Sequence, residues 1–384
     1  MREVLLLCWR DTRHPQGGGS ELYLERVGQE LARRGVRVTL RTAHYPGAAR
    51  AEVRDGVRIS RGGGRFTVYP LALLAIVLAR FGRGPLRGIR PDAVIDTQNG
   101  IPFFARLVSG VPVTVLVHHC HREQWPVAGR LVARVGWFIE SRLSPWLHRD
   151  SQYLTVSLPS AEELALLGVE QERVAVVRNG IDPVLAVAEP RSAEPRMVVL
   201  SRLVPHKQIE DALDVLARLR RRVPGLHLDV VGSGWWDEEL YAHAARLGVL
   251  DAVTFHGHVT ETRKHQVLSR AWVHVMPSRK EGWGITVIEA AQHGVPTVGY
   301  VSSRGLTDSV VDGATGLLVR DLAGMTEAVA GLLGDDLLRR ELGEKARERA
   351  ADFSWGATAD GVGRVLEASV AGRRLGGLVS AARY

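Results

Sequence analysis

The chain has little cysteine and no long apolar run, and each shortage restricts what it can be. Among 384 residues there are two cysteines, Cys8 and Cys120, which lie far apart and match no metal-binding spacing. This favours a reducing compartment and argues against a fold held by disulfides. No run of about 18 apolar residues occurs, so no segment is expected to span a bilayer. The N-terminal MREVLLLCWR has too short an apolar stretch for a signal peptide and is predicted to form a strand.

Two motifs of nucleotide-binding proteins are also missing. Neither QGGGSEL nor VVGSGWW completes G-x-G-x-x-G, because Leu22 and Asp237 stand where the third glycine would be. The strand ending in RTAHY carries no acid for a ribose hydroxyl, which argues against a dehydrogenase. No D-x-D sequence occurs, so the usual acidic pair for a divalent cation on a nucleotide sugar is absent and no metal is predicted.

The composition is that of a folded, basic protein. Hydrophobic residues make up 45% and charged residues 24%, which is typical of a globular enzyme, and the length favours two domains. A net charge of +8 is compatible with nucleic acid or with an anionic membrane. The arginines are not interleaved with stacking aromatics and no recognition motif occurs, so nucleic acid is not predicted as a partner. The abundance of arginine, alanine and glycine suggests a bacterial genome rich in G and C.

Residues 66–82, FTVYPLALLAIVLARFG, form the most apolar stretch of the chain. Four arginines lie at its end and just beyond it, with no acid among them: Arg80, Arg83, Arg87 and Arg90. The segment is either a core helix followed by a basic loop or a helix that lies on an anionic membrane surface. The sequence leaves both interpretations open.

Strand and helix patterns alternate in two successive series. Residues 1–181 form the first series, 182–195 contain three prolines and are predicted as a linker, and the second series covers 196–352. In the first series, Ser160 and Glu163 have the spacing of a capping box and predict a helix start. The pattern predicts an α/β protein with two doubly wound parallel sheets, whose ligands bind at the carboxyl ends of the strands.

Charged and glycine-rich segments follow several of these strands. Arg202 and Lys207 follow the first strand of the second series, where a guanidinium and an ammonium can hold a diphosphate and neutralise its charge as it leaves. The run 17–19 precedes the first helix, and its backbone N–H groups offer an anion site, although a plain turn would also use glycine. Glu281 and Glu289 flank the turn GWG, and such acids need polar partners.

Taken together, these segments resemble the retaining glycosyltransferases of the GT-B fold, the group that includes bacterial α-mannosyl- and α-glucosyltransferases and glycogen synthases. The matching segments occur in the family's order through nearly the whole chain: QGGGSE, RNGID, SRLVPHKQ, VVGSG, FHGHV, EGWGITVIEA and DGATGLLV. The resemblance implies two Rossmann-like domains facing across a cleft, with the acceptor side in 1–181 and the nucleotide-sugar side in 196–352. A C-terminal helix in 353–384 is expected to return to the first domain.

The resemblance also implies roles for these residues. Glu289 would accept hydrogen bonds from the ribose hydroxyls of the donor, and Glu281 would lie near hydroxyls of the transferred sugar. Arg202 and Lys207 would bind the diphosphate. The other donor-binding residues would act mainly through backbone groups: Gly17, Gly18, Gly19, Gly232, Gly234, His258, Val259, Gly282, Trp283, Gly284, Ile285 and Thr286. Family members usually have phenylalanine where this chain has Trp283.

Three histidines occur in VLVHHCHREQW, directly after a predicted strand: His118, His119 and His121. A metal site is not predicted there, because neighbouring strand residues point to opposite faces and Glu123 is the only acid in the segment. The family has a histidine at the end of this strand that contacts the transferred sugar. The spacing to Arg122 and Trp125 favours His118 for that role, with His119 as the alternative.

The reaction implied by the resemblance is hexose transfer from a GDP- or UDP-linked sugar, with retention and without a metal or other cofactor. Arg202 and Lys207 would stabilise the leaving diphosphate, which would itself take the acceptor's proton. Alternatives on the same fold are a nucleotide-sugar epimerase, a phosphorylase and a catalytically silent sugar-nucleotide binder. The acceptor is expected to be a glycan or a lipid-linked molecule, and the protein is expected in the cytoplasm, with the inner membrane face as a candidate partner surface.

Overall fold

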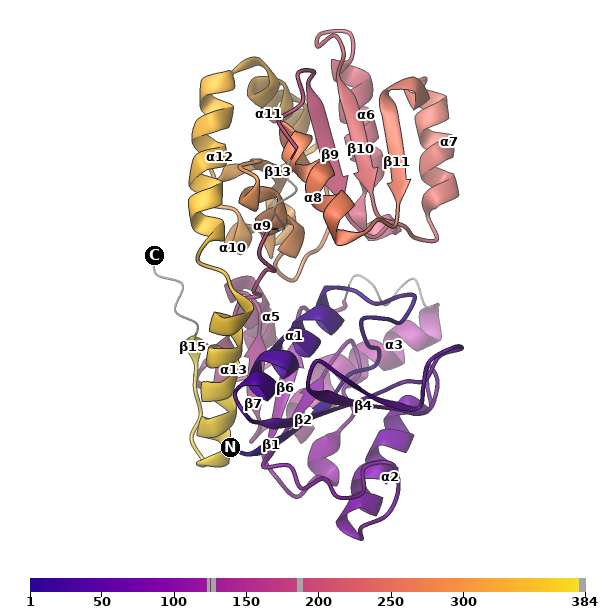
Figure 1. Ribbon diagram of the computed structural model, residues 1–384, viewed down its shortest axis with the longest axis vertical. Helices are drawn as coiled ribbons and strands as arrows, with labels where there is room; N and C mark the ends of the chain where they lie inside the picture. Colours follow the sequence, from indigo (N-terminus) through magenta and orange to yellow (C-terminus); the bar gives the residue numbers. More distant parts are fainter. Residues whose placement is uncertain (123–124, 126–128, 185–188, 380–384) are drawn as a thin grey trace. The chain divides into compact units, whose positions relative to one another are not determined.

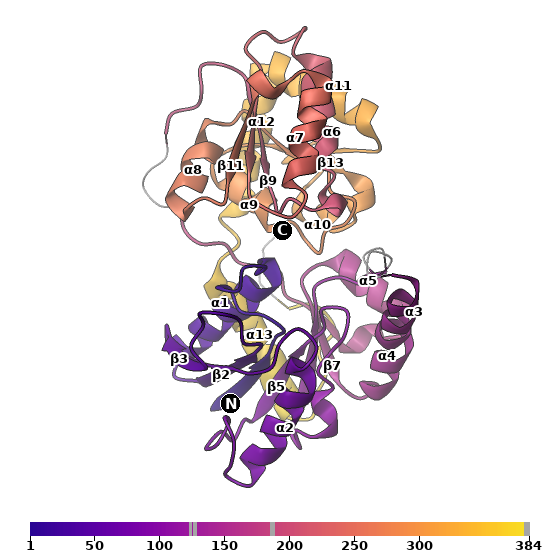
Figure 2. The same cartoon turned by 90° about the vertical axis from the view of Figure 1, so that its right-hand side faces the viewer.

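The computed structural model describes residues 1–122, 125, 129–184 and 189–379, and it divides into two compact units. The first unit comprises Met1–Gly180 and Ser354–Tyr384, and the second comprises Ile181–Phe353. Each unit has its own sheet with helices on both faces (Figures 1 and 2). The predicted linker 182–195 falls at the start of the second unit, and its residues 185–188 lie outside the described part of the chain.

The first unit has a sheet of nine strands in the order β15-β8-β7-β6-β5-β1-β2-β4-β3. All neighbours are parallel except the β3–β4 pair, which is antiparallel. The strands are β1 (Glu3–Leu7), β2 (Arg37–Thr42), β3 (Ala51–Arg54), β4 (Val57–Arg61), β5 (Ala93–Thr97), β6 (Val113–Val117), β7 (Gln152–Thr155), β8 (Val174–Val176) and β15 (Gly377–Leu378). The sequence did not predict β3, β4 and β15, because these short strands contain arginines or a glycine and show no sustained alternation.

The helices of the first unit are α1 (Gly19–Arg33), α2 (Val68–Arg80), α3 (Arg130–Phe138), α4 (Ser144–Leu147), α5 (Leu158–Leu166) and α13 (Trp355–Val370). Successive side chains of β1 point to opposite faces of the sheet. Leu5 and Leu7 pack with α2, while Leu6 lies against Gly28 of α1. The C-terminal helix α13 belongs to this unit, as the fold class implied, and its Asp360 pairs with Arg34 at the end of α1 at 2.6 Å.

The predicted capping box of α5 is wrong. The N-cap is Ser157, whose hydroxyl accepts the Ser160 N–H at 3.2 Å, so the helix begins three residues earlier than expected. Pro159 lies in the first turn, where the missing N–H costs no helical hydrogen bond. Glu163 instead accepts the backbone N–H of Cys120 at 3.3 Å.

Helix α2 coincides with the apolar stretch 66–82. It buries Val68, Ala72, Ala75 and Ile76 in the core of the first unit and leaves the side chain of Leu74 exposed. It is therefore a core helix with an exposed apolar side. No helix in the described part of the chain is long and apolar enough to cross a membrane.

The second unit has six parallel strands in the order β11-β10-β9-β12-β13-β14. They are β9 (Arg196–Leu200), β10 (His227–Val231), β11 (Val253–Gly257), β12 (Val273–Met276), β13 (Thr297–Tyr300) and β14 (Gly316–Val319). The helices are α6 (Ile209–Leu219), α7 (Asp237–Leu247), α8 (Glu261–Arg270), α9 (Ile285–Gln292), α10 (Leu306–Ser309), α11 (Leu322–Gly334) and α12 (Asp336–Ala350). Met197 and Val199 pack with α6 and α11, whereas Val198 packs with α8 and α9, so the central strand is buried on both faces.

Candidate active site

The charged residues predicted in the second unit lie on the segments that follow two neighbouring central strands, β9 and β12. Arg202 is exposed on the loop after β9, and Lys207 ends the short 3₁₀ turn before α6. The Lys207 ammonium donates to the Glu281 carboxylate at 2.5 Å, and the two side chains are 14% and 11% exposed. Glu281 therefore has a cationic partner even without a ligand, and that partner is one of the predicted diphosphate-binding residues.

The turn after Glu281 is held by the loop that follows β13. The Glu281 N–H donates to the Ser303 carbonyl at 3.2 Å, and a Cβ on Gly305 would fall 2.5 Å from the Glu281 carbonyl oxygen. Gly284 has φ of +95°, a conformation that favours glycine, and it is the N-cap of α9. These contacts fix the backbone from Glu281 to Gly284 in one shape, which suits groups that act through backbone atoms.

The Trp283 side chain does not line this surface. It is buried in the second unit, with its ring edge-on to Phe353 at 4.9 Å between centroids, and its Nε1 is buried without a hydrogen-bond partner. The difference from the usual phenylalanine is therefore accommodated in the core. Trp283 can contact a donor only through its backbone.

Glu289, in the first two turns of α9, pairs with a lysine that sequence reasoning missed. Lys264 of α8 donates to Glu289 at 2.6 Å and to Glu261 at 2.5 Å. Burial raises the pKa of Glu289 above its usual range, and the attraction of Lys264 opposes this only in part. Burial would lower the pKa of Lys264, but the two carboxylates outweigh it and raise the pKa. The spacing from Glu261 to Lys264 is that of a helical pair and gave no signal for Glu289.

The glycines of VVGSG serve first to bring two loops together. A Cβ on Gly232 would fall 1.8 Å from the Ser201 carbonyl oxygen, and one on Gly234 would fall 1.9 Å from that of Leu203. The Leu203 N–H also donates to the Ser233 carbonyl at 3.1 Å. The loop after β10 thus supports the loop that carries Arg202, in addition to any contact with a donor.

In the first unit, part of the glycine run is already hydrogen-bonded. The Gly17 N–H donates to the His14 carbonyl at 2.8 Å, and the Gly18 N–H donates to the Glu21 carboxylate at 2.9 Å. Nothing lies within 4 Å of a Cβ built on Gly19, the first residue of α1. The N–H groups that remain for an anion are therefore those of the first helical turn from Gly19 onward, which lack intrahelical acceptors.

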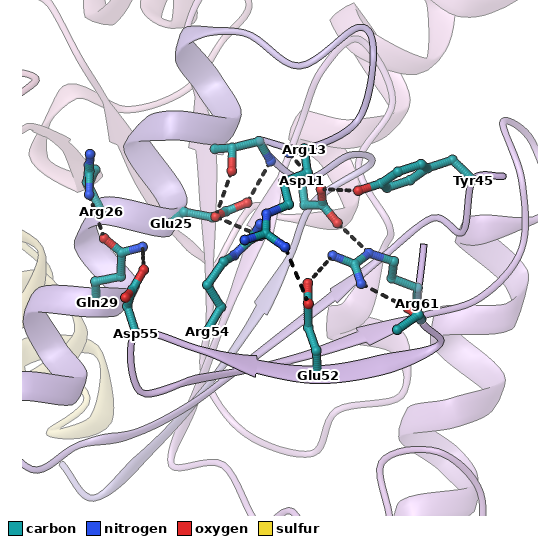
Figure 3. A network of polar contacts seen from close by, with 12 residues as sticks. Asp11, Arg13, Glu25, Arg26, Gln29, Tyr45, Glu52, Arg54, Asp55 and Arg61 are labelled. Carbon is teal, nitrogen blue, oxygen red and sulfur yellow. Dashed lines mark hydrogen bonds and ion pairs between the residues drawn. The ribbon is translucent and has the colours of Figure 1, made fainter. Parts of the chain in front are cut away.

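A polar cluster, which we call the loop brace, holds the segment before this run and consists of the buried Asp11 and Arg61 and the half-buried Tyr45 and Glu52 (Figure 3). Asp11 accepts from Arg61 at 2.5 Å and from the Tyr45 hydroxyl at 3.2 Å. Arg61 also donates to Glu52 at 2.6 Å. Asp11 Oδ1, the oxygen that accepts from Tyr45, also accepts the Arg13 N–H at 2.9 Å, so the brace is tied directly to the loop backbone.

Glu25 of α1 supports the same loop from the helix side (Figure 3). It accepts the backbone N–H and the hydroxyl of Thr12 at 2.6 and 2.9 Å, and it pairs with Arg54 at 3.0 Å. Burial raises the pKa of Glu25, while the bonds from Thr12 and the charge of Arg54 oppose the rise. The sequence gave no indication of these supports, because their members come from four separate segments.

His118 lies at the end of β6, as predicted, and its ring is buried edge-on to Tyr23 of α1 at 5.3 Å between centroids. Burial lowers the pKa of His118 to about 4, so the imidazole is neutral at physiological pH. Its Nε2 is buried without a hydrogen-bond partner. A neutral histidine with an unused ring nitrogen can exchange one hydrogen bond with a sugar hydroxyl.

The other histidines belong to a different arrangement. The His119 and His121 rings lie 4.5 Å apart between centroids with a tilt of 30°, and Glu140 accepts the His121 backbone N–H at 2.9 Å and the Trp125 indole N–H at 2.6 Å. The acid near these histidines is therefore Glu140, and the expectation that only Glu123 sits with them was wrong. Glu123 lies outside the described residues. Glu140 was missed because it follows Trp125 by 15 residues.

The predicted residues fall into two groups. Arg202, Lys207, Glu281 and Glu289 lie in the second unit together with the exposed His258 after β11 and with Val259, which packs beside α8. Gly17, Gly18, Gly19 and His118 lie in the first unit. Ile285 and Thr286 open α9, next to Glu281. No group of three or more potential metal-ligating side chains occurs in the part of the chain that the structure describes.

Comparison with known proteins agrees with this architecture. Glycosyltransferase Family 4 matches residues 17–185, and Glycosyl transferases group 1 matches residues 186–349. Sucrose-phosphate synthase from Thermosynechococcus elongatus superposes with a TM-score of 0.80 at 20% identity, covering 97% of this chain and 100% of that one. The structural likeness shows the fold.

Two curated relatives extend the comparison. Glycogen synthase of Mycobacterium tuberculosis is 33% identical over 274 residues, which are 69% of this chain and 65% of that protein. The GDP-mannose-dependent alpha-(1-6)-phosphatidylinositol monomannoside mannosyltransferase of Mycolicibacterium smegmatis is 31% identical over 369 residues, 89% of this chain and 92% of that protein. With both family matches, the two-sheet architecture and a relative matched over nearly its full length, the chain belongs to the glycosyltransferases of the GT-B fold.

Proposed function

We propose that the protein transfers a hexose from a nucleoside-diphosphate sugar to an acceptor hydroxyl, with retention of anomeric configuration. The observation that carries this is the pairing of Lys207 with Glu281 and of Lys264 with Glu289 at the carboxyl edge of one sheet. Lysine and glutamate side chains at this edge are suited to a ligand that brings both phosphates and hydroxyls. A nucleotide sugar has both, and relatives of this chain include a protein named as GDP-mannose-dependent.

In the proposed complex the diphosphate takes Lys207 away from Glu281. Arg202 and Lys207 then stabilise the charge that develops on the leaving diphosphate, and no metal is required. Glu281, released from the ammonium, accepts hydrogen bonds from the sugar, and Glu289 accepts them from the ribose. His118 donates or accepts one hydrogen bond to the transferred sugar as a neutral imidazole. The leaving phosphate takes the acceptor's proton, so no enzymic nucleophile is involved.

The test is a thermal-shift panel with GDP, UDP, ADP, dTDP and NAD, first with EDTA and then with magnesium. We expect one pyrophosphate nucleotide to stabilise the protein without magnesium, and the effect to be lost in Glu289→Gln. Glu261→Gln is the matched control, because Glu261 also pairs with Lys264 but is exposed. Stabilisation by NAD alone, or by none of the five, would contradict the proposal. The anomeric configuration of the product, read by proton NMR, tests retention.

The acceptor is proposed to be lipid-linked and approached at an anionic membrane surface. Helix α2 leaves Leu71 and Leu74 exposed, and Phe66 and Phe81 beside its two ends are exposed as well. Arg83, Arg87 and Arg90 follow the helix on an exposed basic segment. Exposed apolar side chains beside arginines are typical of helices that bind anionic membranes.

Vesicle flotation tests this surface. Vesicles that contain phosphatidylglycerol should float the wild-type protein, and the triple change of Arg83, Arg87 and Arg90 to alanine should weaken flotation. Replacing the exposed arginines 221, 222 and 340 of the second unit by alanine removes the same charge and should leave flotation unchanged. Equal flotation of both triple variants would contradict a membrane surface at this position.

A further inference from the structure

Arg41, at the carboxyl end of β2, is buried without a counter-charge. It is 3% exposed, its Nη1 donates to the Ser60 hydroxyl at 3.0 Å, and its Nε is buried with no hydrogen-bond partner. Burial lowers the pKa of Arg41, and no carboxylate among the described residues offsets this. An uncompensated buried charge costs several kcal/mol. The missing negative charge is therefore one that a ligand can supply.

The face of the sheet on which Arg41 lies explains why no acid reaches it. Arg41 lies in register between Ser60 of β4 and Leu7 of β1, and Leu7 packs with α2. Asp96 lies beyond Leu7 in the same row, about 10 Å from Arg41 across two strand spacings. Its carboxylate accepts two backbone N–H groups at 2.7 and 2.8 Å and is already satisfied.

The loop brace uses the other acids nearby. Arg61 directly follows Ser60 in β4, so its side chain leaves the opposite face of the strand. There Arg61 donates hydrogen bonds to both Asp11 and Glu52, as Figure 3 shows. Two arginines at the ends of neighbouring strands therefore differ: Arg61 has two carboxylates and Arg41 has a single hydroxyl.

Glycine-rich backbone covers the guanidinium of Arg41. Gly62, Gly63 and Gly64 connect β4 to α2, and a Cβ on Gly62 would fall 2.4 Å from Nη2 of Arg41. Gly63 has φ of +78°, and a Cβ there would fall 2.7 Å from the backbone of Thr67. The run thus puts backbone without side chains between Arg41 and the N-terminus of α2, with the Gly62 N–H donating to the Thr42 carbonyl and the Gly64 N–H to the Thr67 hydroxyl.

The surroundings of this run are positive. The first turn of α2 contains no acidic residue, so the positive end of the helix dipole is not offset. Arg65 is exposed directly after the glycines, and Gly63 and Gly64 are half-buried. An anion approaching past Arg65 would meet the helix end, the glycine backbone and then the buried guanidinium.

We propose that Arg41, the run 62–64 and Arg65 form a binding site for a phosphate group, a monoester or diester carried by the acceptor. The guanidinium supplies charge-assisted donors to the phosphate oxygens, and the glycines, which carry no side chains, leave room for the phosphate. Identifying this ligand as the acceptor rests on the proposed function. The phosphate site itself does not, because none of its residues is among those assigned to the donor.

Titration of the full chain with glycerol 3-phosphate tests the site, with glycerol as the uncharged control and a saturating pyrophosphate nucleotide present. Arg41→Met should lower the affinity for glycerol 3-phosphate at least about tenfold, and Arg41→Lys should lower this affinity less. Arg37→Met is the matched control, since Arg37 lies at the other end of β2, pairs with Glu3 and should leave affinity unchanged. The ligand-free Arg41→Met protein should unfold at the same or a higher temperature, because a buried unpaired charge is removed.

A second variant keeps the charge of Arg41 and reduces the space beside its guanidinium. Gly62→Ala places a methyl group against the guanidinium, whose flexible end can shift, so this variant should fold and still lose affinity for glycerol 3-phosphate. If Arg41→Met or Gly62→Ala folds and binds glycerol 3-phosphate as the wild type does, the site is wrong. Competition between glycerol 3-phosphate and the nucleotide would also overturn it, because the probe would then occupy the donor site.

Flotation distinguishes a lipid headgroup from a soluble phosphate. Vesicles of phosphatidylcholine with phosphatidylinositol that float the wild type, but not Arg41→Met, would identify a lipid phosphodiester. Binding of glycerol 3-phosphate alone, with no Arg41-dependent flotation, would identify a soluble phosphomonoester. Binding of neither overturns the proposal. These titrations need no turnover, so a protein that binds glycerol 3-phosphate through Arg41 but no nucleotide would disprove the proposed function and leave this site standing.

Discussion

The two units hold buried charge in different ways. The central pair of the loop brace, Arg61–Asp11, is closed: its side chains are 1% and 0% exposed, and each has at least one further partner. The pairs of the second unit, Lys207–Glu281 and Lys264–Glu289, are as short, but their side chains are 11% to 14% exposed.

This difference separates ion pairs that hold the fold from ion pairs whose members can bind a ligand instead of each other. A closed ion pair cannot be replaced by a ligand and fixes the backbone to which it is attached. An open pair keeps two charges satisfied in the empty protein and can release both to a ligand that offers an anion and hydroxyls. The length of an ion pair therefore does not reveal its role, whereas access does.

The largest effect on stability is expected at the loop brace. Asp11→Asn leaves Arg61 with Glu52 as its remaining carboxylate, and breaking a buried pair should lower the free energy of unfolding by about 3 kcal/mol. Urea denaturation measures the loss. Glu341→Gln, which breaks the exposed pair with Lys345, is the control and should change stability by less than about 0.5 kcal/mol. Equal effects of the two changes would refute the claim that the brace is structural.

For the Lys207–Glu281 pair, a mutation should have a large effect on activity and a small effect on stability. Lys207→Met should lower kcat/KM by about 100-fold or more, equivalent to about 3 kcal/mol of transition-state stabilisation, because the diphosphate loses a cation. Its free energy of unfolding should change by about 1 kcal/mol or less, since Glu281 is partly solvated and can take up water. Steady-state kinetics and urea denaturation on one preparation give both numbers. A variant that loses stability but keeps kcat/KM would place Lys207 with the brace.

Much of the fold could be predicted because its signal is periodic. Strands such as β1 and β6 are continuous apolar runs, and helices such as α1 repeat their apolar residues at helical spacing, so the alternation of a doubly wound sheet is visible in one dimension. The start of α5 was misplaced because Ser157 and Ser160 are both good N-caps and only backbone geometry chooses between them. The edge strand β3 exists through pairing with β4, which the sequence of β3 alone does not encode.

The site was predictable only where its residues form one motif. Glu281 and Glu289 share a segment and were found together, whereas Lys264 and Glu140 were missed because their partners lie on other helices or loops. The same holds for Arg41: a basic residue at the end of a strand looks like Arg61 in sequence, and only the register and the face of the sheet show that one has carboxylates and the other does not. Charged residues that pair across distant segments have no characteristic spacing in the sequence, so their pairing cannot be predicted from it.

The buried His118 should make the first unit sensitive to acid. Its pKa is about 4 in the folded protein and 6.5 without burial, so the unfolded chain binds more protons between these values. Stability is therefore lost as pH falls below 6.5, by about 2 kcal/mol at pH 5 for this one group. His118→Asn should lose less stability than the wild type between about pH 7 and 5, measured by urea denaturation across that range.

Two features make this test specific. His148, His274 and His293 also have pKa values lowered by burial to about 4, but they remain in the variant, so the difference between the curves isolates His118. His258→Asn is the control, because His258 is exposed and should leave the pH dependence unchanged. Parallel curves for the wild type and His118→Asn would mean that the imidazole is solvated.

The smallest effect is expected when a mutation of Lys264 breaks the Lys264–Glu289 pair. In Lys264→Met the charge that opposes burial is gone, so the pKa of Glu289 should rise further above its usual range. If ionised Glu289 accepts from the ribose, nucleotide affinity in this variant should rise as pH increases from about 5.5 to 8, by roughly fivefold or about 1 kcal/mol. The wild type should change less, since Lys264 favours the ionised carboxylate. Isothermal titration calorimetry at the two pH values measures both, with Lys345→Met as a surface control. The same pH dependence in variant and wild type would show that Lys264 does not govern Glu289, and the second unit's pairs would then be as closed as the brace.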